Sequence, residues 1–150
     1  MKDNFETEGA TEWLGVYYRT ILSTDASGGG ISITDSLSPA GSGPPRHVHH
    51  DADETFVILT GEALFWKDGE SFVAGPGDTV FIPRGVPHTF RVTDQGPSRH
   101  LVIMTPGGFE DFFHAMGEGK YAIPGDMEKV VEIGQQYQLE FVGPPLDGTE

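Results

Sequence analysis

The feature that most limits the fold of this 150-residue chain is a succession of short runs rich in β-branched and aromatic residues. Each run ends at glycine, proline, aspartate or serine, residue types that favour turns. The predicted strands are Trp13–Leu22, Ile31–Leu37, Glu54–Thr60, Glu62–Lys67, Glu70–Ala74, Thr79–Ile82, His88–Thr93 and His100–Thr105. Asp68 and Gly69 predict a two-residue hairpin, because both central positions of a type I′ turn need a positive φ. Eight short strands indicate an antiparallel barrel or sandwich.

Two segments after the last predicted strand have helical spacing instead. Apolar residues follow the i, i+3, i+4, i+7 pattern in Gly107–Met116, at Phe109, Phe112, Phe113 and Met116. A similar pattern occupies Asp126–Tyr137, where Asp126 is placed as the N-cap. We therefore expect one domain over residues 1–150, with a barrel over about 13–105 and a helical segment over about 107–142 packed outside the sheet.

Composition excludes several classes of partner and chemistry. The chain has 9 Lys and Arg against 23 Asp and Glu, a formal net charge of −14, and its basic residues are scattered, so nucleic acid and anionic membranes are disfavoured as partners. No stretch approaches the roughly 18 apolar residues of a membrane helix. The absence of cysteine excludes disulfides and thiolate metal sites and fits a cytoplasmic location. We expect a soluble, cytoplasmic protein whose partners are small molecules.

Four of the six histidines occur in two places, His47, His49 and His50 in one run and His88 alone, and three of them have a spacing typical of a metal site. On an extended segment, His47 and His49 point to the same face and His50 points away. Glu54 can return a carboxylate to that face, and His88 follows 34 residues later on what can be a neighbouring strand. Three imidazoles and one carboxylate suit a divalent transition metal such as Fe, Mn, Ni, Cu or Zn. We predict one such metal on His47, His49, Glu54 and His88, with its identity left open, and treat His50, His100 and His114 as structural or exposed.

The two segments that carry these residues resemble the two motifs of the cupin family. GSGPPRHVHHDADETFVILTG, from Gly41 to Gly61, resembles the first motif, and GDTVFIPRGVPHTFRV, from Gly77 to Val92, resembles the second. The second motif usually ends on an asparagine where this chain has Val92, a departure that bears on substrate contacts because that asparagine is not a metal ligand. The resemblance implies a mainly β fold, a single cupin β-barrel (double-stranded β-helix, or jelly roll) with two short C-terminal helices. It also implies the metal ligands His47, His49, Glu54 and His88.

Residues that alternate with the predicted ligands are candidates for the substrate pocket. Phe56 and Ile58 share a face with Glu54, and Phe90 and Val92 share one with His88, so all four should line the barrel interior beside the metal. An apolar pocket favours a planar or aromatic substrate, although these side chains could equally fill the barrel. Either Tyr17 or Tyr18 should face inward. The helical Phe109–Met116 stripe is either core or a lid over the barrel mouth.

Within the cupins, the chain resembles small quercetin 2,3-dioxygenase-like proteins. The resemblance is carried by the single-barrel length, the run HVHH, the stretch PRGVPHTFRV and a tail of TPGGFEDFFHAMG followed by LEFVGPP. It implies a metal-dependent dioxygenase that acts with O₂ on a hydroxylated aromatic or enolisable small molecule. Glu54 would then be the fourth ligand or the base that takes a substrate hydroxyl proton.

Two other classes of function stay open at this point. One is a non-catalytic cupin that senses a ligand or metal, and the other is a metal-dependent isomerase or epimerase acting on sugars or keto acids. The resemblance also implies a homodimer, since single-domain cupins commonly pair their barrels through edge strands. The segment Trp13–Leu22 is the candidate for covering a neighbour's edge.

Overall fold

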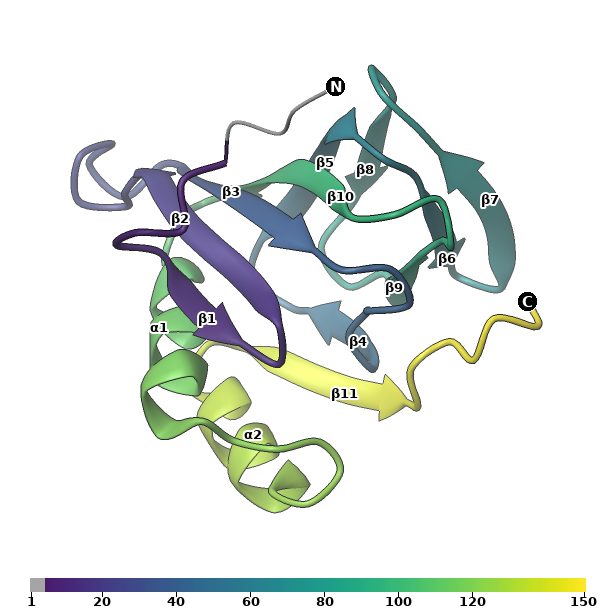
Figure 1. The fold of residues 1–150 in the computed structure, drawn as a ribbon. Helices are drawn as coiled ribbons and strands as arrows, with labels where there is room; N and C mark the ends of the chain where they lie inside the picture. The colour runs from purple at the N-terminus through teal and green to yellow at the C-terminus, as the bar shows by residue number, and fades with distance from the viewer. Residues whose placement is uncertain (1–4) are drawn as a thin grey trace.

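The computed structural model describes residues 5–150, which form two antiparallel sheets facing each other, with two helices at one end (Figure 1). In spatial order, the first sheet contains β1 (Thr11–Trp13), β2 (Val16–Leu22), β3 (Ser32–Ser38), β10 (Ser98–Thr105), β5 (Asp53–Thr60) and β8 (Thr79–Ile82). The second contains β11 (Leu139–Gly143), β4 (Arg46–His49), β9 (His88–Val92), β6 (Ala63–Lys67) and β7 (Glu70–Ala74). The helices are α1 (Glu110–Gly119) and α2 (Met127–Gln135).

Most of the predicted strands are confirmed within one or two residues. Local chemistry explains this agreement in the β6–β7 hairpin, where Asp68 and Gly69 have φ values of 48° and 91° and Lys67 pairs with Glu70. Both turn residues occupy the left-handed region that a type I′ turn requires.

One predicted strand and the end of the predicted helical segment are wrong. The segment predicted as a single strand from Trp13 to Leu22 is a hairpin, which turns at Leu14 and Gly15, both with positive φ. The amide of Gly15 donates to Oε1 of Glu12 at 2.7 Å, which closes the turn. The C-terminal segment is also not helical to residue 142, because Leu139–Gly143 forms β11 and pairs with β4.

The core lies between the two sheets. On β5 the inward side chains alternate, so Phe56 and Ile58 are buried, and Phe56 packs edge-to-face against Phe65 of the opposite sheet at 5.1 Å between ring centroids. This alternation is the period of two expected for a strand with one face on the core.

The two helices close one end of the sandwich, with α1 against β1 and α2 against β11 (Figure 1). Phe112 and Met116 of α1 are buried in the same core as the sheets. The ring of Phe112 packs edge-to-face against that of Trp13 of β1, with 6.0 Å between ring centroids. The helices thus contribute to the core rather than only covering its outside. Asp126 occupies the predicted N-cap position of α2, but its carboxylate accepts from the amide of Ala122 instead of capping the helix.

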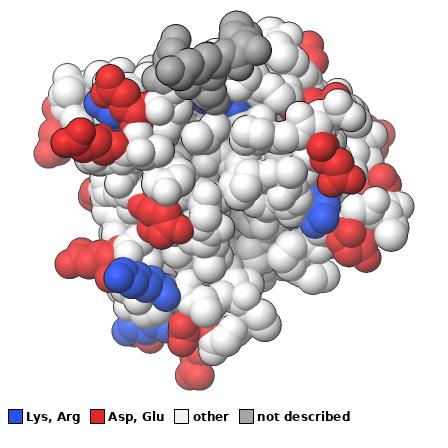
Figure 2. Space-filling model, viewed as in Figure 1, with Lys and Arg blue, Asp and Glu red and all other residues white. Residues whose placement is uncertain are grey.

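Charge is spread over the surface without a basic patch on the face drawn in Figure 2, where acidic side chains outnumber the few basic ones. Within residues 5–150, neither helix has the length and apolarity needed to cross a bilayer.

Two motif glycines differ in what surrounds them, and this difference predicts different costs of substitution. Gly61 (φ +74°) and Gly77 (φ +88°) both have left-handed backbones, but a Cβ at Gly61 would also collide with the carbonyl oxygen of Pro97, whereas nothing lies near one at Gly77. We expect Gly61→Ala to lower the free energy of unfolding by about 3 kcal/mol or more and Gly77→Ala by about 1–2 kcal/mol. Urea denaturation of both variants tests this, and equal losses would contradict it.

Candidate metal centre

The four predicted ligands come from both sheets and meet between them. His47 and His49 lie on β4, where the strand period turns both imidazoles inward, and both are buried. The side chain of His50 is 49% exposed and points away from this face, where its Nε2 forms a hydrogen bond with Oε2 of Glu140. His88 begins β9 and pairs directly with His47. The short turn after β4 carries the chain across to β5 in the opposite sheet, so Glu54 approaches the histidines from the other side.

The ligand atoms of His47, His49, Glu54 and His88 all lie within 4.8 Å of one another. Nε2 of His88 is 2.6 Å from Oε1 of Glu54, and Nε2 of His49 is 3.4 Å from the same oxygen. The rings of His47 and His88 are 4.4 Å apart between centroids. All four side chains are buried, so bulk water does not solvate the carboxylate.

Backbone carbonyls orient two of the imidazoles. Nδ1 of His47 lies 2.7 Å from the carbonyl oxygen of Pro45, and Nδ1 of His88 lies 3.0 Å from that of Val86. Because a carbonyl only accepts, Nδ1 of each ring is the donor in these contacts, and in the neutral ring of His47 this leaves the lone pair on Nε2. This outer hydrogen bond is the usual partner of a metal-binding histidine, since it fixes both tautomer and ring orientation.

The electrostatics favour the deprotonated forms that a metal requires. Burial lowers the pKa of His47 well below its ordinary value, and the neighbouring His88 and His49 lower it further. Burial on its own raises the pKa of Glu54, but the adjacent His49 and His88 outweigh it and hold the pKa of Glu54 well below its ordinary value. At neutral pH the group therefore offers a carboxylate and an uncharged imidazole of His47. Three nitrogens and one oxygen, buried around one negative charge, fit a divalent transition metal.

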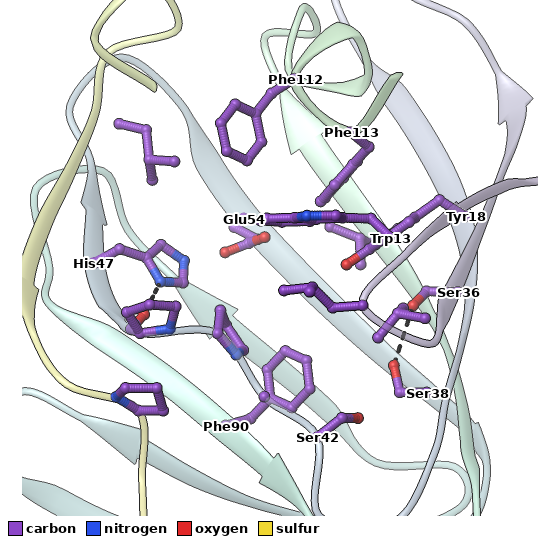
Figure 3. Close-up of a pocket in the computed structure, with 18 of the residues that line it drawn as sticks. Trp13, Tyr18, Ser36, Ser38, Ser42, His47, Glu54, Phe90, Phe112 and Phe113 are labelled. Atoms are coloured by element: carbon purple, nitrogen blue, oxygen red, sulfur yellow. Dashed lines mark hydrogen bonds between the residues drawn. The ribbon is translucent and has the colours of Figure 1, made fainter. Parts of the chain in front are cut away.

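A cavity of about 310 Å³ opens beside this group, with His47, His49 and Glu54 in its wall (Figure 3). Much of the wall is apolar, and its aromatic residues are Trp13, Tyr18, Phe56, Phe90, Phe109, Phe112, Phe113 and Phe141. Besides the candidate ligands, the polar side chains in the wall are those of Ser36, Ser38, Ser42 and His100. None of the lining residues, within the described part of the chain, is lysine or arginine.

The predicted substrate residues divide into two pairs. Phe56 and Phe90 line the cavity, whereas Ile58 and Val92 are fully buried and do not border it. Ile58 and Val92 are therefore core residues in the structure, and the substrate contacts proposed below do not include them. Of the two candidate tyrosines, Tyr18 lines the cavity and stacks on Phe113 at 4.1 Å.

The cavity wall includes part of the Phe109–Met116 stripe, predicted as core or lid, and several residues that the sequence prediction missed. Phe109, Phe112 and Phe113 line the cavity while Met116 is buried in the core, so the stripe is both wall and core. Trp13, Ser36 and Ser38 were not singled out. His100, which the sequence left as structural or exposed, is 2% exposed and lines the cavity. A signal for it exists, because His100 and Val102 share one face of β10 by the strand period.

Comparison with known proteins identifies the fold. Residues 36–104 match the family model described as the cupin domain. This part of the chain is a cupin domain. The whole fold is accordingly the mainly β, jelly-roll cupin fold, with two C-terminal helices. Over 97% of its length the chain superposes on a cupin-like protein from Thermotoga maritima, with a TM-score of 0.64, 16% identity and 92% of that chain covered.

Curated relatives of this cupin include enzymes of more than one kind. It is 29% identical over 101 residues to quercetin 2,3-dioxygenase of Bacillus subtilis, which covers 67% of this chain and 30% of the relative. It is 36% identical over 121 residues to dimethylsulfoniopropionate lyase DddQ of Ruegeria pomeroyi, covering 69% of this chain and 59% of the relative. Among the relatives it matches first, the chain spans 30% to 60% of their length.

Loading with a divalent metal should stabilise the folded protein. After chelation and dialysis, a saturating metal that binds only the folded state is expected to add about 4 kcal/mol when its free concentration is about 1,000 times the dissociation constant. His88→Ala should abolish this increment, and His50→Ala, which changes a neighbouring exposed histidine, should retain it. Thermal denaturation with and without Mn²⁺, Ni²⁺ or Zn²⁺ measures the increment. An equal increment in His88→Ala would contradict the assignment.

Acidification should destabilise the protein through His100. Burial lowers the pKa of His100 from 6.5 to about 4, so the unfolded chain binds the proton more readily between these values. The free energy of unfolding therefore falls as the pH falls through this window, by up to about 3 kcal/mol from this group. In His100→Phe the loss between pH 7 and pH 4 should be smaller by that amount, measured by urea denaturation. His114→Phe, at an exposed position, is the control and should follow the parent protein.

Proposed function

We propose that this cupin is a mononuclear metal-dependent dioxygenase of the quercetin 2,3-dioxygenase-like type, acting on a hydroxylated aromatic small molecule. The observation that carries the proposal is the adjacency of the buried His47, His49, Glu54 and His88 group to a cavity with aromatic walls. Small-molecule sites are mostly apolar concavities with a few convergent polar groups, and this cavity has that composition. Similarity to the quercetin 2,3-dioxygenase of Bacillus subtilis supports the choice of reaction.

The metal would be held by His47, His49, His88 and Glu54. When bound, a redox-active metal would supply Lewis acidity toward a substrate oxygen and access to the oxidising power of O₂. The protein's own side chains would accept the substrate proton, bind the substrate ring and exclude water.

Glu54 is placed to accept a proton from the substrate. Its Oε1 faces His88 and His49, which leaves Oε2 as the oxygen that can take the proton. A carboxylate of low pKa is a weak base, so Glu54 would accept the proton only from a hydroxyl whose own pKa a bound metal would lower, such as a conjugated enol or phenol. This preference agrees with a hydroxylated aromatic substrate.

Aromatic side chains would hold the substrate ring and exclude water. The rings of Phe56 and Phe90 lie 5.7 Å apart and nearly perpendicular, so a planar ligand can meet the face of one and the edge of the other. Trp13, Phe112 and Phe113 cover the cavity from the side of β1 and α1 (Figure 3). Exclusion of water from this site would protect reactive intermediates from hydrolysis.

An isomerase or epimerase acting on sugars or keto acids fits the cavity less well. Those substrates are polar or anionic and call for lysine, arginine or several amide contacts, and no lysine or arginine lines the described cavity wall. Charged groups buried without partners are costly, so an anionic substrate is disfavoured there.

A metal-dependent lyase is the second candidate function. The dimethylsulfoniopropionate lyase DddQ is 36% identical over 121 residues, and aromatic walls also bind onium groups through cation–π attraction. Decay of dimethylsulfoniopropionate without O₂ consumption would favour the lyase. Ligand binding without turnover of either substrate would favour a non-catalytic sensor.

Oxygen uptake tests the proposal directly. The metal-loaded protein should consume O₂ in proportion to the loss of quercetin, measured with an oxygen electrode and by absorbance. His47→Ala should lower the rate at least about 100-fold, because changes even to the outer partners of metal ligands cost 10–100-fold. His50→Ala is the matched control and should keep the parent rate. An unchanged rate in His47→Ala, or no uptake with flavonols and hydroxylated aromatic ketones, would overturn the proposal.

The homodimer and the cytoplasmic location stay predictions. The segment Trp13–Leu22 pairs within its own chain, as the β1–β2 hairpin against β3, so it does not offer a free arm to a neighbour. The edge strand β7 exposes Phe72 and Val73, by 39% and 57% respectively, and is the better candidate for pairing between copies.

A further inference from the structure

One wall of the cavity is polar and lies away from the metal ligands. Tyr18 of β2 pairs with Ser36 of β3, which pairs in turn with His100 of β10. Side chains at paired positions point to the same face of a sheet, so these three form a row on the inner face. Ser38 lies two residues beyond Ser36 on that face. Figure 3 shows Ser36 and Ser38 across the cavity from His47.

His100 is the unexplained member of this row. Its side chain is 2% exposed, Nδ1 is fully buried without a hydrogen-bond partner, and the described residues provide no hydrogen bond to its ring. Burial lowers its pKa to about 4, so at neutral pH the ring is uncharged and offers one N–H donor and one nitrogen acceptor. Buried polar groups in native proteins are nearly always paired, and an unpaired one calls for an explanation.

The neighbouring hydroxyl groups also have unused hydrogen-bonding capacity. Oγ of Ser36 and Oγ of Ser38 are 3.5 Å apart, at the long limit for a hydrogen bond between hydroxyls. Ser36, Ser38 and His100 are uncharged at neutral pH, and among the described residues no lysine or arginine lines the cavity. Such a wall matches a neutral hydroxyl group, which both donates and accepts, better than a carboxylate or phosphate.

A single aromatic ring separates this wall from the metal centre. Phe56 lies 6.4 Å from the ring of His88 and 5.8 Å from the ring of His100, between centroids. Phe90 contacts His100 edge-on at 5.1 Å. A planar ligand lying along these two phenylalanines would therefore present one end to the metal ligands and the other to His100.

We propose that His100 and Ser36 form a second recognition site, which binds a phenolic hydroxyl group at the end of the substrate remote from the metal. The inference rests on the proposed function in one respect, that an aromatic ligand occupies the cavity. It adds that the substrate is a polyphenol with hydroxyl groups at both ends, and it makes His100 a specificity-determining residue.

Binding of two flavonols under anaerobic conditions tests the site without turnover. Both 3-hydroxyflavone and kaempferol carry the 3-hydroxyl group, but only kaempferol has hydroxyls on both outer rings, so its orientation in the cavity does not matter. Dissociation constants of the metal-loaded protein are measured by calorimetry. His100→Phe should reduce the preference for kaempferol about tenfold and leave the affinity for 3-hydroxyflavone near that of the parent, because one buried hydrogen-bonding partner is lost.

Two further variants make the result decisive. Ser36→Ala removes a hydroxyl from the same wall without adding volume, should lower the preference about threefold, and replaces His100→Phe if that variant does not fold. Ser98→Ala, a buried serine on the same strand outside the cavity wall, should keep the parent preference. An unchanged preference in His100→Phe and Ser36→Ala, or no binding of either flavonol, would overturn the inference. If the parent protein prefers kaempferol over 3-hydroxyflavone and the variants lose this preference, but the parent protein consumes no O₂, the second recognition site is supported. Only the proposed dioxygenase activity is then refuted.

Discussion

The structure depends on one buried negative charge, the carboxylate of Glu54, held between two sheets. A buried carboxylate is costly unless charged or hydrogen-bonding groups surround it, and here His88 and His49 approach the same oxygen from the opposite sheet. Three features of the fold bring them there, namely the short turn from β4 to β5, the pairing of His47 with His88, and the inward period of β5. The same contact that ties the two sheets together therefore also assembles the donors of a metal site.

The matched cupin region and its flanks have different roles. Residues 36–104 include all four candidate ligands together with Phe56, Phe90 and His100. The covering walls come from outside that region, from the N-terminal hairpin through Trp13 and Tyr18 and from the C-terminal segment through Phe112 and Phe141. The metal end of the cavity is thus built by the family's common core, and its shape by segments in which relatives with the same core can differ. This division is consistent with relatives named for different reactions.

What the sequence predicts well is determined locally. The Asp68-Gly69 hairpin and the grouping of His47 with His49 follow from turn chemistry and strand period alone. Pairings between distant segments were missed, as with β11 on β4, because no local signal specifies which strand meets which. The N-terminal hairpin was missed because its turn uses Leu14, an unusual residue for a left-handed backbone. The role of His100 was missed because the predicted strand began at this residue. The strand begins at Ser98 instead, so His100 lies within the strand and inside the barrel.

The formal net charge of −14 influences which molecules approach the protein. Only one of the acidic residues belongs to the candidate metal group, so the remainder set a negative potential around the molecule. Such a field concentrates divalent cations near the protein and repels carboxylates and phosphates, and dissolved salt weakens it beyond about 10 Å. An acidic exterior therefore favours the approach of cations and neutral molecules to the cavity over the approach of anions.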